Sequence, residues 1–263
     1  MYKSMMLDQL KVLVFPSREE LGEYGAVDAA EKIRSVISRK GEANMIFASS
    51  PSQMDVLNAM LQRTDIEWEK INAFHMDEYI GVSADMPYSF VNYIKVNLFS
   101  KVKLKSVHYL DGLAMDPEKE SKRYADLLDE YPTDITMYGI GANGHLAFND
   151  PGIADFNDPV NVKINASLDA ECINQQVVDG WFATHDDVPK SAYTVTMPPM
   201  LRSEYMIGMV PSITKANIIG RLFREGISED LPGSALRNHP NAILLLDQAS
   251  ASEIDSEMSE RFV

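Results

Sequence analysis

Three side chains that can bind or transfer a proton lie close together near the middle of the chain. The segment 139–152 reads GIGANGHLAFNDPG and supplies an amide at Asn143, an imidazole at His145 and a carboxylate at Asp150. Histidine titrates nearest to neutral pH, and a nearby carboxylate can orient the ring and stabilise its charged form. The segment therefore predicts acid–base chemistry, although a turn with a capping Asn and a partly buried His would use the same residue types.

The glycines of this segment match the G-x-G-x-x-G pattern of dinucleotide sites. That motif requires a helix that begins at the third glycine, and Pro151 and Gly152 follow Gly144 too closely for one. It also usually occupies the first strand-to-helix turn, whereas this segment lies in mid-chain. We therefore interpret the glycines, Gly141 among them, as positions where the backbone amides approach a ligand.

A second candidate segment is AFHMDEYIG at 73–81, where an apolar strand ends in Asp77 and Glu78. Carboxylates are costly at such a place unless they are paired or used in chemistry, and a cap for the next helix is the alternative. His75 and Asp77 also have the spacing of a metal pair, but this spacing is common and we expect no metal. The single cysteine, Cys172, excludes an internal disulfide and a Cys-based zinc site and is typical of a reducing compartment.

Short apolar runs alternate with amphipathic runs along the chain, which is the pattern of a parallel sheet covered on both faces. The Ser-x-x-Glu sequence at 17–20 predicts the start of a helix that ends near Lys40, before Gly41. We expect one doubly wound, mainly parallel α/β domain over residues 1–263, a Rossmann-like three-layer sandwich with 149–184 as an irregular lid or loop. The predicted strands are 11–15, 44–48, 71–75, 107–110, 134–140, 193–196, 205–210 and 242–246, and the other predicted helices are 54–63, 89–100, 117–130 and 215–224. Ligands bind such sheets at the carboxyl ends of the strands, where the polar loops SSPSQ, MDEY and GANGH lie.

Composition limits the partners. The chain has 24 Lys and Arg against 39 Asp and Glu, a net charge of −15, which disfavours nucleic acid. No run approaches the roughly 20 apolar residues of a membrane span, and the N-terminal segment lacks a signal-peptide cleavage site. We expect a cytoplasmic protein without a nucleic-acid or membrane partner.

Taken together, MDEYIG and GIGANGHLAFNDP resemble the glucosamine-6-phosphate deaminase/isomerase family. Further matching segments follow in the same order, so the resemblance covers nearly the whole chain; they are SSPSQ, VPKSAYTV, VPSITKA and LRNHPNAILLLD. The related 6-phosphogluconolactonases share the fold and the glycine–histidine core. They usually carry Asp-Glu-Arg where this chain has Asp77-Glu78-Tyr79, and Ser-Leu-Phe-Pro after the His-x-Ala, so AFNDP favours the deaminases.

The resemblance implies a role for each site residue. Asp77 would move a proton between C2 and C1 of a hexosamine 6-phosphate, and His145, oriented by Asp150 and Asn143, would open the sugar ring. The amine of the substrate would activate C2 without a metal or cofactor, giving fructose 6-phosphate and ammonia. The residues that would bind the sugar or its phosphate are Ser49, Ser50, Ser52, Gln53, Gly141 and Lys215.

Three departures from the family pattern leave alternatives open. Asn143 and Asp150 stand where many members have Asp and Glu, and ECINQQV at 171–177 lacks the arginine that many members place on the phosphate. Arg237 or Arg202 would have to replace that arginine. The alternatives are galactosamine 6-phosphate as substrate, lactone hydrolysis, or a non-catalytic sugar-phosphate sensor; the oligomeric state, including a homo-oligomer, also stays open.

Overall fold

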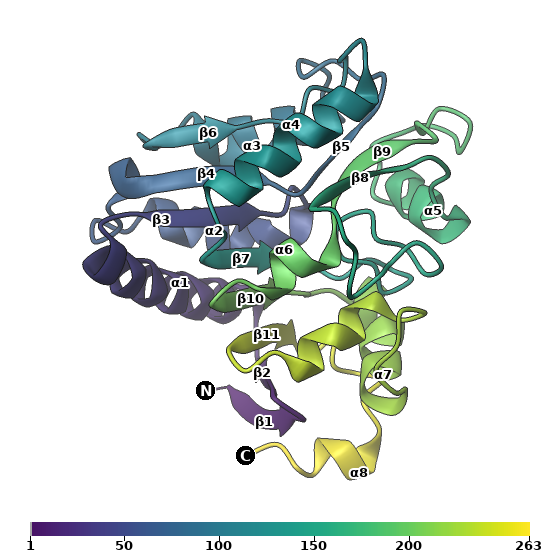
Figure 1. Ribbon diagram of the computed structural model, residues 1–263. Coiled ribbons are helices and arrows are strands. Elements are labelled where there is room, and N and C mark those ends of the chain that lie inside the picture. The colour runs from purple at the N-terminus through teal and green to yellow at the C-terminus, as the bar shows by residue number, and fades with distance from the viewer. Residues whose placement is uncertain (1) are drawn as a thin grey trace.

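The computed structural model describes residues 2–263 and is built on an eight-stranded sheet (Figure 1). The strand order is β1-β2-β11-β10-β7-β3-β4-β6, and every neighbouring pair is parallel except β1 with β2. The predicted mainly parallel α/β fold is thus confirmed. The strands are β1 (Lys3–Leu7), β2 (Leu10–Phe15), β3 (Ala43–Phe47), β4 (Ile71–His75), β6 (Ser106–His108), β7 (Ile135–Tyr138), β10 (Tyr205–Met209) and β11 (Ala242–Asp247).

Helices cover both faces of this sheet, and each covered face has its own apolar core. Along β11, Leu244 enters one core while its neighbours Ile243 and Leu245 enter the other, because successive side chains of a strand point to opposite faces. One core is shared with α1 (Arg18–Lys40), α2 (Met54–Leu61) and α3 (Phe90–Ile94), which continues as a π-helix over Lys95–Phe99. The other is shared with α4 (Pro117–Glu130), α6 (Met197–Leu201) and α7 (Ala216–Arg224).

Local sequence signals set the limits of the helices. The Ser17 hydroxyl accepts a hydrogen bond from the Glu20 N–H at the start of α1, and Gly41 ends the helix in the left-handed conformation with φ of 84°. The remaining helices are α5 (Ala170–Val178), α8 (Ser256–Ser259) and 3₁₀ turns at Pro51–Gln53, Trp68–Lys70, Ile213–Lys215 and Pro232–Asn238. Within residues 2–263, no helix is long and apolar enough to cross a bilayer.

A second, antiparallel sheet lies at one end of the main sheet and carries α5 (Figure 1). Its strand order is β5 (Asp77–Tyr79), β9 (Ala192–Val195) and β8 (Val162–Asn165). The sequence predicted a strand near β9 but not that it leaves the main sheet, and it did not predict β5 or β8. The segment 149–184 is therefore not irregular throughout, since it contains β8 and α5.

Candidate active site

A pocket opens at the carboxyl ends of the parallel strands, where the sequence placed it. Its walls come from the loops after β3, β7 and β10, together with the start of β5 and the first residue of α1. The predicted site residues that line it are Ser49, Ser50, Ser52, Asp77, Gly141, His145 and Lys215. Side chains from α5 and the loop after it close the remaining side, namely Gln175, Gln176, Asp179 and Trp181.

The glycine turn after β7 is shaped around the ring of His145. The Gly141 N–H donates to the His145 carbonyl at 3.0 Å, and a Cβ on Gly141 would lie under 3.0 Å from three atoms of the imidazole. Gly144 has φ of 95°, a conformation that glycine adopts without strain. No helix begins at Gly144, and the chain continues through turns to Gly152. The turn therefore holds an imidazole and not a dinucleotide phosphate.

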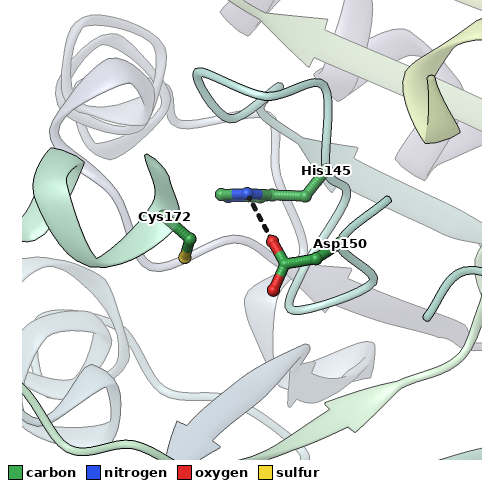
Figure 2. Close-up of side chains that lie close together, drawn as sticks. All are labelled: His145, Asp150 and Cys172. Atoms are coloured by element: carbon green, nitrogen blue, oxygen red, sulfur yellow. Dashed lines mark ion pairs between the residues drawn. The ribbon is translucent and has the colours of Figure 1, made fainter. Parts of the chain in front are cut away.

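His145 lies beside a fully buried carboxylate (Figure 2). Its Nδ1 is 3.2 Å from Asp150 Oδ1, which is ion-pair distance, although no group of residues 2–263 is aligned for a hydrogen bond with this nitrogen. Asn143 organises both, because its Nδ2 donates to Asp150 Oδ1 at 3.0 Å and its Oδ1 accepts from the His145 N–H at 3.0 Å. Asn143 and Asp150 do not line the pocket, so they can act on a ligand only through His145.

The Asp150 carboxylate is fixed on its other side as well. Its Oδ2 accepts from Asn165 Nδ2 at 3.1 Å and from the Asp169 N–H at 3.3 Å. Burial alone would raise the pKa of Asp150, but the His145 imidazole, the Asn143 amide and the Asp169 N–H outweigh it, so the pKa lies below its ordinary value. Asp150 is therefore an anion at neutral pH that can stabilise a protonated imidazole.

Asp77 and Glu78 are neighbours in β5 with different surroundings. The Glu78 carboxylate accepts from the Ser89 hydroxyl at 2.5 Å and from the N–H groups of Phe90 and Val91, so it caps α3. Asp77 instead lines the pocket, and burial together with the charge of Glu78 raises its pKa well above the ordinary value. Glu78 is thus the cap for the next helix, whereas Asp77 is the carboxylate of the pair that lies in the pocket.

The loop after β3 presents hydroxyl groups to the pocket. The Ser50 and Ser52 hydroxyls are 2.8 Å apart, and the buried Ser49 hydroxyl has no hydrogen-bond partner within residues 2–263. Gln53 does not line the pocket, because its side chain is buried and donates to the Tyr138 carbonyl at 3.1 Å, which ties the loop to β7. A ligand in the pocket would thus meet the serines and not Gln53.

The cations of the pocket differ in part from those predicted. Lys215 lines it, and burial lowers the pKa of its ammonium group. The structure does not bring Arg237 or Arg202 to the pocket: Arg237 Nε donates to Asp8 at 2.7 Å, and Arg202 faces Asp129 at 3.9 Å. Arg18 also lines the pocket, and it was not predicted, because the first residue of a helix that begins with a capping sequence carries no signal of a binding role.

One group in the described chain has metal-ligating atoms close together. The ligand atoms of His145, Asp150 and Cys172 lie within 4.8 Å of one another, and Figure 2 shows the thiol and the carboxylate on the same side of the ring. The other pair, His75 with Asp77, belongs to no group of three or more such residues within residues 2–263. The His75 Nε2 accepts from the Leu110 N–H at 2.9 Å, and burial lowers its pKa to about 3.

Comparison with known proteins gives a consistent result. Residues 16–162 match the family of glucosamine-6-phosphate isomerases/6-phosphogluconolactonase. Glucosamine-6-phosphate deaminases from Lacticaseibacillus paracasei and Streptococcus suis are 28% and 32% identical, over 94% and 88% of this chain and 100% and 95% of theirs.

Solved structures agree with this result. A monomeric glucosamine-6-phosphate deaminase superposes with a TM-score of 0.83 at 29% identity, over 92% of this chain and 99% of that one. The 6-phosphogluconolactonase of Thermotoga maritima shares the fold. It superposes with a TM-score of 0.72 at 18% identity, over 90% of this chain and 98% of that one. The chain therefore belongs to the glucosamine-6-phosphate isomerase/6-phosphogluconolactonase family of enzymes.

Proposed function

We propose that the enzyme converts a hexosamine 6-phosphate, glucosamine 6-phosphate in the first instance, and water to fructose 6-phosphate and ammonia. The observation that carries the proposal is one pocket that holds a buried carboxylate at Asp77, an imidazole backed by an anion at His145, and an ammonium at Lys215. The names of the related deaminases support the same substrate.

His145 opens the sugar ring. The ring closes through O5 on C1, so opening requires a proton to leave the O1 hydroxyl and a proton to arrive at O5. An imidazole can do both, because one nitrogen accepts the first proton and returns it to the second oxygen. Asp150 stabilises the charged ring between the two transfers, and Asn143 holds both groups in place.

Asp77 then carries a proton from C2 to C1 of the open chain. The carboxylate takes the C2 proton, and the electron pair of that bond forms the double bond between C1 and C2 while the π electrons of the C1 carbonyl move to O1, which takes a proton from the substrate ammonium. The lone pair of the resulting amine then forms the C2=N bond as the same carboxyl returns its proton to C1. The product is an imine at C2; water adds to this carbon and ammonia leaves. One positioned carboxylate is sufficient for both transfers, and no cofactor is needed.

The state of Asp77 favours an aminated substrate over a lactone. Its pKa is raised by burial and by Glu78, so the free enzyme holds this carboxyl protonated over a wider pH range than an exposed Asp. A positively charged amine beside it favours the ionised form, which is the form that acts as a base. A lactone brings no such charge.

Ammonia release from glucosamine 6-phosphate, measured beside galactosamine 6-phosphate and 6-phosphogluconolactone, tests the proposal. We expect ammonia from an amino sugar and exchange of its C2 proton with solvent. Rapid hydrolysis of the lactone without ammonia would make the enzyme a lactonase, and calorimetric binding without turnover would make it a sensor.

A pair of variants assigns the base. Asp77→Asn keeps the shape of the side chain and removes its basicity, so we expect substrate binding without C2 exchange. Asp126→Asn is the matched control, because that carboxylate is exposed on α4, pairs with Lys122 and does not line the pocket. Retained exchange in Asp77→Asn would remove Asp77 from the base role.

A further inference from the structure

We propose that Arg18 is the second cation of the phosphate subsite, so that the substrate phosphate lies between α1 on one side and Lys215 on the other. This inference rests on the proposed function, since it names the residue that recognises the phosphate of the sugar. It assigns a binding role to the first residue of α1.

The first step compares the positive charges in the pocket with the negative charge of a phosphate. Among its lining residues within 2–263, the permanently cationic side chains are Arg18 and Lys215. The side of the pocket formed by α5 and the loop after it offers the amides of Gln175 and Gln176 and the carboxylate of Asp179, and 171–177 carries no Lys or Arg. A phosphate dianion carries two charges, and one ammonium whose pKa is already lowered by burial balances it only in part.

The second step is the geometry of the guanidinium. Nε and Nη2 of Arg18 both contact the same oxygen of Asp55, Oδ2, at 2.8 and 2.6 Å. Nη1 has no hydrogen-bond partner within residues 2–263, so one edge of the planar group stays available. Two N–H groups on one edge of a guanidinium match two oxygens of a phosphate, a geometry that an ammonium group does not offer.

The third step is the position of Arg18 relative to the hydroxyl groups. Asp55 is the second residue of α2, which begins directly after the turn Pro51–Gln53. The helices α1 and α2 pack so closely that a Cβ on Gly22 would meet the Asp55 backbone at 2.8 Å. Asp55 therefore holds the guanidinium beside the turn that carries Ser50 and Ser52. The phosphate would meet hydroxyl donors from this turn and the cation from α1 together.

The ion pair with Asp55 does not prevent this role. The side chain of Arg18 is 45% exposed, and ion pairs with this much solvent contribute about 0–1 kcal/mol. The guanidinium can therefore turn toward a phosphate at little cost. Asp55 acts as a positioning residue that keeps the flexible side chain at the pocket in the absence of substrate.

The test compares Arg18→Gln with Arg18→Lys in steady-state kinetics and in calorimetry with inorganic phosphate. Loss of a charged, bidentate contact predicts a KM for glucosamine 6-phosphate raised about 10- to 100-fold with kcat changed less than threefold. Arg18→Lys should recover part of the affinity because it keeps the charge. Arg34→Gln is the matched control, since Arg34 lies on the same helix and pairs with Asp65 away from the pocket.

Calorimetry separates this inference from the proposed function. Phosphate binding to the wild-type enzyme that is weakened in Arg18→Gln and unchanged in Arg34→Gln supports the role of Arg18, whether or not ammonia is formed. Equal phosphate affinity in the wild type and Arg18→Gln overturns it even if the enzyme is a deaminase. An unchanged KM in Arg18→Gln overturns it as well.

Discussion

The packing of His145 against Gly141 allows a sharp test of the site, because one added methyl group would move the imidazole. In Gly141→Ala the new Cβ would lie under 3.0 Å from three ring atoms, whereas non-bonded carbons settle at about 3.5–4.0 Å. Since the nearest ring atoms would lie at 2.1 Å, the ring must retreat by about 1.5 Å. The backbone does not oppose the substitution, since Gly141 is not among the residues with positive φ.

This displacement should affect catalysis far more than folding. A misplacement of about 1 Å costs on the order of 100-fold in rate, so kcat for ammonia release should fall by that factor. The side chain of His145 is 13% exposed at the pocket, so the ring can move outward, and the loss of stability should stay near 1 kcal/mol, the lower limit for overpacking. For a chain of this size that is a Tm lower by about 3 °C.

Steady-state kinetics and thermal melts of five proteins check the reasoning: the wild type, Gly141→Ala, His145→Ala, the double variant and a control. In a His145→Ala background the added methyl meets no ring, so Gly141→Ala should no longer lower the stability. The double-mutant cycle should therefore give a coupling energy of about 1 kcal/mol between positions 141 and 145. Gly226→Ala is the control, because a Cβ there has open space around it. A Gly141→Ala enzyme with kcat within threefold of the wild type would refute this account of the glycine turn.

Three further predictions concern buried titratable groups. Burial and Glu78 raise the folded-state pKa of Asp77, so this group lowers the stability of the fold as pH rises from the unfolded-state pKa of about 4 toward the raised folded-state pKa. Asp77→Asn should therefore melt above the wild type at pH 8, by a margin that shrinks toward pH 4. Asp150 has a lowered folded-state pKa, so its contribution to the free energy of unfolding is present above about pH 4 and is lost as pH falls. Asp150→Ala should lower the free energy of unfolding by about 3 kcal/mol at pH 7, or Tm by roughly 10 °C. A decrease below about 1 kcal/mol would contradict the stabilising role of the hydrogen bonds around Asp150. The Cys172 thiol is buried, and burial raises its pKa. Alkylation by iodoacetamide at pH 8 should therefore be slow until denaturant unfolds the chain, and rapid labelling of the native enzyme would contradict the burial of this thiol.

The sequence predicted the main sheet well because its signals there are local and strong. The run KVLVF, the capping sequence at Ser17 and the terminal Gly41 each determine their own element, and the structure places β2 and α1 accordingly. The second sheet was missed for a physical reason. β5 has only three residues, and β8 forms a strand only by pairing with β9. No local pattern specifies that β9 belongs to a second sheet and not to the main one.

The same distinction applies to the site. His145, Asp77 and Lys215 follow directly on strands or turns of the main sheet, so topology alone brings them to the pocket. Arg237 was a reasonable candidate by charge, but its direction depends on Asp8 at the far end of the chain, and that pairing has no signature in the sequence. Arg18 was missed for the opposite reason, because the packing of α1 on α2 and not a motif brings it to the pocket.

The two proposed acid–base groups come from different sheets, and Asn149 of the NDP segment joins them. Asp77 lies in β5, where its register partner in β9 is Thr194, whereas His145 follows β7 of the main sheet. The buried Asn149 donates to the Leu146 carbonyl beside His145 and to the Val195 carbonyl beside Thr194, both at 2.8 Å. Because ring opening by His145 at O1 and O5 and proton transfer by Asp77 between C2 and C1 act on neighbouring atoms of one substrate, the distance between the two groups must be set by bonds across the two sheets. Asn149 supplies these bonds. The NDP segment therefore sets the distance between His145 and Asp77 through Asn149, and it supplies the Asp150 carboxylate that supports the imidazole.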